Sequence, residues 1–117
     1  MSEYQYYEFR AVDQPLTRQQ MDELRRLSDR AEITATRFVN TYNWGDFRGN
    51  PDKVLEKHFD VFLYVANWGT HLFQLRLPRQ MAELETIRPY SGGPGLEIRA
   101  TDPFVLLKFS WDRTEKN

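Results

Sequence analysis

The tripeptide Asn-Trp-Gly occurs twice in this chain, at Asn43-Trp44-Gly45 and at Asn67-Trp68-Gly69. Each copy follows a run rich in β-branched and aromatic residues, a composition that favours strands. Glycine adopts positive φ without a Cβ clash and asparagine tolerates the same region, so both tripeptides predict points where a strand ends and the chain turns. The tryptophan beside each turn places a large amphipathic ring at the rim of a sheet.

Six runs of the chain have the composition and spacing of strands. Side chains alternate between the two faces of a strand, and in the first run this puts Tyr7, Phe9 and Ala11 together on one face. Asn67 to His71 has the right length to join two of the runs as a hairpin. The expected strands are Tyr4–Val12, Ile33–Trp44, Val61–Ala66, Leu72–Leu77, Leu96–Ala100 and Val105–Trp111.

Two helices have recognisable start signals. Thr17 followed by Gln20 forms a capping box, and apolar residues recur at helical spacing behind it, which predicts a helix from Arg18 to Asp29. Asn50-Pro51 is typical of an N-cap and first helical residue, and Val54, Leu55, His58 and Phe59 supply the buried stripe of a second helix. A third short helix is expected over Met81–Ile87, followed by a flexible connector over Ser91–Gly95.

The order of these elements predicts an α+β fold. A mainly antiparallel sheet covered by helices on one face is expected, and ferredoxin-like topology is the nearest standard description. The 117 residues suffice for one core, so a single domain is predicted over residues 1–113, with a polar tail over 114–117.

Charge and composition narrow the classes of function. Sixteen Lys and Arg against seventeen Asp and Glu leave a net charge of -1, which gives no broad attraction for nucleic acid or an anionic membrane. The chain has no cysteine, so it can form neither a disulfide nor a thiolate metal site, and this fits the reducing cytoplasm. The N-terminus lacks the layout of a secretory signal, and Val61–Ala66, the longest apolar run, is too short to span a membrane. A soluble cytoplasmic protein without a cofactor or metal is expected.

No reaction centre is evident. His58 and Asp60 are close in sequence, but a strand rising about 3.3 Å per residue separates them from His71, so the histidines should lie roughly 20 Å apart. A shared metal site is therefore not expected. Ser28 and Ser110 have no neighbouring base, and the glycine cluster lacks the Lys-Ser/Thr ending of a phosphate loop. No catalytic residue is predicted.

The loop after the strand that ends near Trp44 is the best candidate for binding a partner. It brings rings, an acid and a guanidinium together between glycines, and tryptophan and arginine are favoured interface anchors. The competing interpretation is that Trp44 and Phe47 fold back onto the core while Arg48 pairs with Asp46 or Asp52. The predicted partner-binding residues are Tyr42, Trp44, Asp46, Phe47, Arg48 and Trp68.

Three segments carry a resemblance to a known family: Leu27–Thr34, Asn40–Gly49 and Phe59–Thr70. Through them the chain resembles a family of bacterial hypothetical proteins, over most of its length. The resemblance implies bacterial origin, and it implies no activity, cofactor or catalytic residue. Members of the family are longer, with a further helical region after the matching part. If such a region normally follows here, the last hairpin is expected to present a surface for it.

Three classes of function remain open, and a non-catalytic protein-interaction or scaffolding domain is preferred. Its partner would be another protein or a second copy of the chain. Rings on both strand faces favour this class, because a sheet covered on one side should leave some of them uncovered. The rings in question are Tyr4, Tyr6, Tyr42 and Trp68.

The other two classes are binding of single-stranded nucleic acid and binding of a small molecule. Stacking of bases on exposed rings would suit the first, but the overall acidity disfavours it. The second needs a pocket between sheet and helices, in which Arg10, Arg37 or Arg76 would orient an anionic ligand and Asp60 or His71 would act as acid or base.

Overall fold

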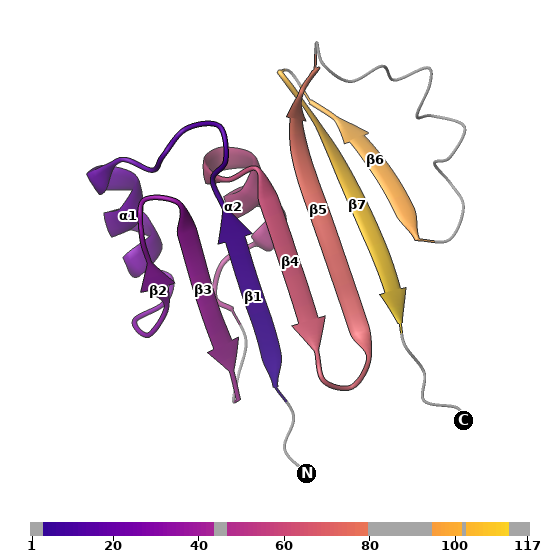
Figure 1. The fold of residues 1–117 in the computed structure, drawn as a ribbon, viewed down its shortest axis with the longest axis horizontal. Coiled ribbons are helices and arrows are strands. Elements are labelled where there is room, and N and C mark those ends of the chain that lie inside the picture. Colours follow the sequence, from indigo (N-terminus) through magenta and orange to yellow (C-terminus); the bar gives the residue numbers. More distant parts are fainter. Residues whose placement is uncertain (1–3, 44–46, 80–94, 102, 113–117) are drawn as a thin grey trace.

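The computed structural model describes residues 4–43, 47–79, 95–101 and 103–112 of the chain. Within these residues, seven strands form a single sheet and two helices pack with it (Figure 1). In chain order the elements are β1 (Gln5–Arg10), α1 (Arg18–Arg25), β2 (Glu32–Ile33), β3 (Arg37–Tyr42), α2 (Pro51–His58), β4 (Val61–Ala66), β5 (Thr70–Pro78), β6 (Leu96–Ala100) and β7 (Phe104–Asp112).

The sheet has the strand order β2-β3-β1-β4-β5-β7-β6, and every neighbouring pair is antiparallel. This confirms the α+β class and the antiparallel sheet. Both β3 and β4 pair with β1, so they run parallel to each other on either side of it. In the same way β1 and β2 flank β3. Each of these separated parallel pairs is connected through a helix, by α1 between β1 and β2 and by α2 between β3 and β4.

Both predicted helix starts are confirmed. The Thr17 hydroxyl oxygen accepts a hydrogen bond from the Gln20 backbone N–H at 3.1 Å, and the Gln20 side-chain oxygen accepts one from the Thr17 N–H at 2.8 Å. In α2 the Asn50 side chain accepts from two backbone N–H groups, and Pro51 is the first helical residue. These contacts satisfy donors that have no partner within a helix, which is why the sequence signals mark the ends correctly.

The end of α1 differs from the prediction. The helix stops at Arg25 and not at Asp29, and Arg26 is its C-cap. The Arg25 guanidinium donates to the backbone carbonyls of Ser28, Asp29 and Ala31 at 2.8 to 3.2 Å. These contacts hold the carbonyls in a loop, where they have no helical partner, so the chain turns toward β2 one turn early.

The single long strand expected over Ile33–Trp44 is also wrong. The chain turns back between β2 and β3, where Thr34 and Arg37 exchange backbone hydrogen bonds. The Thr34 hydroxyl accepts a further bond from the Thr36 N–H at 3.2 Å. A threonine side chain that bonds the backbone two residues on stabilises a turn, and here it overrides the β propensity of the run. The predicted helix at Met81–Ile87 and the connector up to Pro94 lie outside the described residues.

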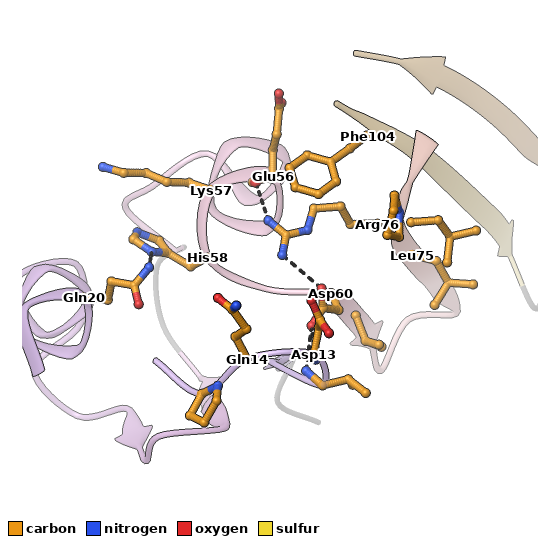
Figure 2. A pocket seen from close by; sticks show the side chains of 15 residues that line it. Asp13, Gln14, Gln20, Glu56, Lys57, His58, Asp60, Leu75, Arg76 and Phe104 are labelled. Carbon is orange, nitrogen blue, oxygen red and sulfur yellow. Dashed lines mark hydrogen bonds and ion pairs between the residues drawn. The ribbon is translucent and has the colours of Figure 1, made fainter. Parts of the chain in front are cut away.

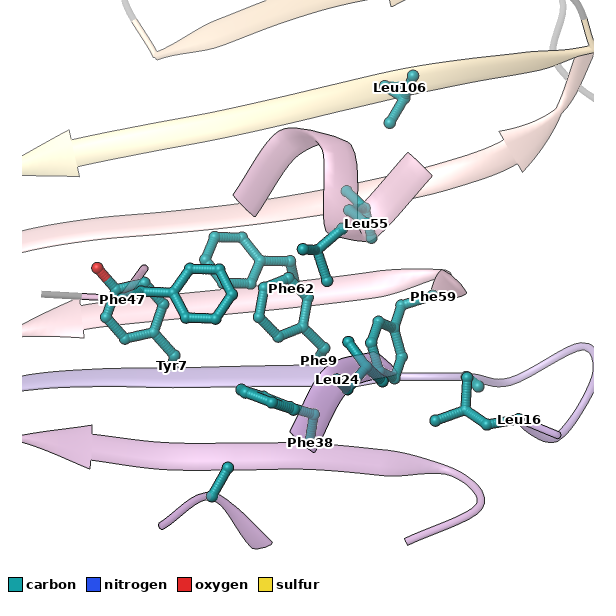
Figure 3. Close-up of a cluster of buried hydrophobic side chains, with 13 residues drawn as sticks. Tyr7, Phe9, Leu16, Leu24, Phe38, Phe47, Leu55, Phe59, Phe62 and Leu106 are labelled. Carbon is teal, nitrogen blue, oxygen red and sulfur yellow. The ribbon is translucent and has the colours of Figure 1, made fainter. Parts of the chain in front are cut away.

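The core is built from aromatic rings around Phe9 (Figure 3). The Phe9 ring lies 4.4 Å from that of Phe62, 5.2 Å from that of Phe59 and 5.6 Å from that of Phe38, measured between centroids. In the register of the sheet, Phe9 stands opposite Phe38 on one side and Phe62 on the other. Leu24 of α1 and Val54 and Leu55 of α2 are buried in the same cluster.

Replacing Phe9 with alanine tests whether the core depends on this ring, which contacts the rings of Phe38, Phe59 and Phe62. Phe9→Ala should lower the free energy of unfolding by about 3 to 5 kcal/mol, because it removes a fully buried ring and leaves a cavity. Urea denaturation measures the loss. Val12→Ala is the control, since Val12 is 74% exposed and should change the stability by no more than about 0.5 kcal/mol. Equal effects of the two substitutions would contradict the central role of Phe9.

Candidate functional site

The structure places the described residues of the predicted binding loop in different environments. Phe47 is buried in the core cluster, with its ring 5.3 Å from that of Tyr7, so it is a packing residue and not a surface anchor. Tyr42 is half-buried and also packs edge-on against Tyr7, at 5.3 Å. Arg48 is exposed. Trp44 and Asp46 lie outside the described residues.

Trp68 lies where the sequence predicted it, in the turn between β4 and β5. Gly69 has a φ of 118°, and its N–H donates to the carbonyl of Ala66 at 3.0 Å, which closes a tight turn. The Asn67 side-chain oxygen accepts from the Tyr4 N–H at 2.9 Å and so ties the start of the described chain to this turn. The Trp68 side chain is 51% exposed.

A continuous set of apolar side chains lies on the sheet face opposite the aromatic core. Strand register aligns Leu63, Phe73, Phe109 and Leu96 in one row across β4, β5, β7 and β6, and it aligns a second such row beside the first. None of these residues belongs to the core cluster. We call this set the apolar sheet face: Val61, Leu63, Val65, Phe73, Leu75, Leu77, Leu96, Ile98, Val105, Leu107, Phe109 and Trp111.

Most of the apolar sheet face keeps part of its surface exposed. Val105 and Leu107 are buried, Trp111 is 50% exposed, and the other members are half-buried. At one end, His71 stacks on Trp111 with the rings 5.1 Å apart and 7° from parallel. Val61–Ala66 is apolar at nearly every position, and this pattern is the sequence signal for the face, because it is expected of a strand covered on both sides.

The charged residues on this side of the sheet lie over β1, β2 and β3 and are paired. Arg10 forms an ion pair with Glu8, and Arg37 lies 3.6 Å from Glu32. Burial alone would raise the pKa of Glu8, but hydrogen bonds from Tyr6 and Arg10 lower it below the usual value. Arg10 and Arg37, two of the arginines predicted to orient an anion, are therefore occupied with carboxylates.

Arg76, the third predicted arginine, lies in a pocket of about 750 Å³ near the C-terminal end of β5 (Figure 2). Its guanidinium donates to the carbonyl of Glu56 at 2.6 Å and to Asp60 at 2.9 Å, and it lies 4.3 Å above the ring of Phe104. The pocket is lined by Val12, Asp13, Gln14, Pro15, Gln20, Glu56, Lys57, His58, Asp60, Val61, Leu75, Arg76, Leu77, Pro78 and Phe104.

Asp60 is held as an ionised carboxylate in this pocket. Its second oxygen accepts from the backbone N–H groups of Val12 at 2.6 Å and Asp13 at 2.9 Å. Burial would raise the pKa of Asp60, but these two N–H groups and Arg76 together lower it below its usual value. The sequence singled out Arg76 and Asp60 as a ligand anchor and an acid or base. The structure pairs them with each other, so they mainly join β1, α2, β4 and β5.

His58 has a structural partner beside each ring nitrogen. Burial and the nearby charge of Lys57 lower its pKa, partly opposed by Glu23. Nδ1 lies 3.3 Å from the Gln20 amide nitrogen, which is a donor, so Nε2 carries the proton and faces Glu23 at 3.5 Å. His71 lies further along the chain on β5, next to Trp111 of β7. Within the part of the chain that the structure describes, no three His, Asp or Glu residues gather as a metal site would need.

A smaller, polar pocket of about 380 Å³ lies between the loop after α1 and the end of β3. Ser28 is only 5% exposed, and its hydroxyl oxygen accepts from the Asn40 amide at 2.8 Å and from the Tyr42 hydroxyl at 3.4 Å. Two predicted residues, Tyr42 and Arg48, thus meet residues that sequence reasoning did not connect to them. The polar pocket is lined by Leu27, Ser28, Asp29, Arg30, Asn40, Thr41, Tyr42, Asn43 and Arg48.

Comparison with known protein families, curated proteins and solved structures gives no significant match. The resemblance to a family of bacterial hypothetical proteins therefore stays a prediction. No helix formed by the described residues is long and apolar enough to cross a membrane.

The Asp60 junction predicts a specific dependence of stability on pH. A carboxylate whose pKa is lowered by folding adds stability above its unfolded pKa, about 3.9, and that stability is lost as the pH falls through the folded pKa. Asp60→Asn should therefore be less stable than wild type at pH 7, and the difference should shrink below about pH 4. Urea denaturation at several pH values measures this. Asp13→Asn is the matched control, because only the backbone of Asp13 contacts Asp60. A difference that stays constant with pH would contradict the assignment.

Proposed function

We propose that this protein is a non-catalytic protein-interaction domain that docks through the apolar sheet face. The observation that carries the proposal is the alignment of apolar side chains across β4, β5, β7 and β6, on the side away from the aromatic core. Contiguous exposed apolar surface on a small domain is typical of an interaction site. Trp111 at one end of this face and Trp68 in the turn between β4 and β5 are each about half exposed, and tryptophan is a favoured interface anchor.

The connections of the first four strands support an uncovered face. The order β2-β3-β1-β4, with helices between β1 and β2 and between β3 and β4, follows the split βαβ pattern of ferredoxin-like folds. Crossovers between parallel strands are almost always right-handed, and two right-handed crossovers in opposite directions put both helices on one face. Burial of Leu24 and Leu55 in one cluster agrees with this arrangement. On this interpretation β5, β7 and β6 widen a ferredoxin-like sheet whose other face is not covered by α1 or α2.

A second copy of the chain is the occupant that the surface chemistry favours. The net charge of -1 gives two copies little reason to repel each other. The charges beside the apolar sheet face are already neutralised as Glu8 with Arg10 and Glu32 with Arg37. Two twisted sheets can pack face to face with their side chains interdigitated, and a two-fold axis lets the same patch serve both partners. We therefore propose a homodimer formed by two apolar sheet faces.

The same face carries the rings on which a single-stranded nucleic acid would stack. Phe73, Phe109 and Trp111 lie on it. The arginines on the same side of the sheet, Arg10 of β1 and Arg37 of β3, are paired with carboxylates. Affinity for nucleic acid depends on unpaired cations that contact phosphates. The nucleic-acid class is therefore the weaker candidate, and a test of the surface with a fluorescent oligonucleotide separates it from the protein-binding class.

A charge placed in the centre of the apolar sheet face should prevent self-association. Phe109→Glu would bury an unpaired carboxylate in the dimer, which costs several kcal/mol. We expect wild type to elute as a dimer at micromolar concentration and Phe109→Glu as a monomer, as measured by size-exclusion chromatography with light scattering. Ser110→Glu is the matched control, because the adjacent residue of β7 points to the opposite face. A monomeric wild type at high concentration, or equal loss of the dimer in both variants, would refute the homodimer.

A further inference from the structure

We propose that the polar pocket binds the oxyanion group of a small molecule, either a phosphate or a carboxylate. Its walls come from the loop after α1, from the end of β3 and from Arg48 of the predicted binding loop. This site is separate from the apolar sheet face, and it does not depend on the proposed homodimer. The proposal is carried by the charge, the hydrogen-bonding groups and the rigidity of the polar pocket.

The polar pocket holds two arginines for which no carboxylate partner is found among the described residues. Among the residues the structure describes, neither Arg30 nor Arg48 forms an ion pair, whereas Arg10, Arg37, Arg76 and Arg99 all do. Asp29 also lines the polar pocket, so its described lining residues carry two guanidinium groups and one carboxylate. Arginine presents a planar fork of donors that matches the oxygens of carboxylate and phosphate.

Hydroxyl and amide groups complete the lining. The Tyr42 hydroxyl lies 3.4 Å from the Ser28 oxygen, a long contact that is weak as a hydrogen bond. It can therefore turn to donate to a bound oxyanion at little cost. The Ser28 oxygen still accepts from the Asn40 amide at 2.8 Å if the tyrosine turns away. These groups suit an oxyanion better than an apolar ligand.

The wall of the polar pocket is fixed before any ligand binds. Arg25 holds the carbonyls of Ser28, Asp29 and Ala31, which places the loop that carries Arg30. The edge-on contact with Tyr7 fixes the position of the Tyr42 ring. A site that is ordered in advance loses less conformational entropy when it binds, so even a small anion can be held.

An NMR titration of the full chain with inorganic phosphate tests the proposal, with sodium chloride at equal ionic strength as the reference. We expect the amides of Ser28 to Arg30 and of Asn40 to Asn43 to shift with a dissociation constant in the millimolar range. A second titration with acetate distinguishes the two sources of the oxyanion. A response to phosphate alone assigns a phosphate group, and a response to acetate alone assigns a carboxylate.

Three substitutions locate the binding groups. Arg30→Met and Arg48→Met should each weaken binding about tenfold, because each removes a charge-assisted contact from an exposed side chain without touching the core. Tyr42→Phe should weaken it about threefold and keep the ring contact with Tyr7. Arg26→Met is the matched control, because Arg26 is exposed and lies outside the polar pocket. Equal weakening by the control, or no shift beyond that caused by chloride, would overturn the proposal.

Discussion

The contact of Phe9 with Phe38 and Phe62 is the constraint on which the rest of this structure depends. Side chains alternate along a strand, so a slip of one residue in the pairing of β1 would turn Phe9 to the opposite face. The three rings stand side by side across β3, β1 and β4, and Leu24 and Leu55 of the two helices pack in the same cluster. One row of rings therefore fixes the register of the central strands.

That register also determines the character of the opposite face. Once Phe62 points into the core, Leu63 must point away from it, and Phe73 and Phe109 follow in the same row. In β1 and β3 the outward positions are mostly polar or charged, with Glu8, Arg10 and Arg37 among them and Val39 as an apolar exception. In β4, β5, β7 and β6 they are apolar except for His71. The change from a polar to an apolar outer face within one sheet is the reason to assign an interaction surface to one half of the molecule only.

Sequence reasoning succeeded where structure is decided by neighbours in the chain. The capping residues Thr17 and Asn50 and the turn at Gly69 each act within a few residues, and each was predicted correctly. The sequence also predicted two hairpins, which correspond to the pairs β4 with β5 and β6 with β7. The position of β1 between β3 and β4 depends on contacts between residues far apart in the sequence, so the sequence suggested it only through the ferredoxin-like description and not through any local signal. The early end of α1 escaped prediction for a related reason, since no propensity shows that Arg25 will bind carbonyls in the next loop.

The candidate sites escaped prediction for the same physical reason. Asp60 and Arg76 were singled out as separate functional groups, but only the pairing of β4 with β5 shows that they neutralise each other. Tyr42 and Arg48 were predicted to bind a protein, but the loop held by Arg25 gives them Ser28 and Arg30 as neighbours in a polar pocket. Asn40 and Tyr42 reach that pocket from the core side of β3, whereas the apolar sheet face is on the other side of the sheet. A partner on the apolar sheet face would therefore leave the polar pocket open, and the two proposed sites can act independently.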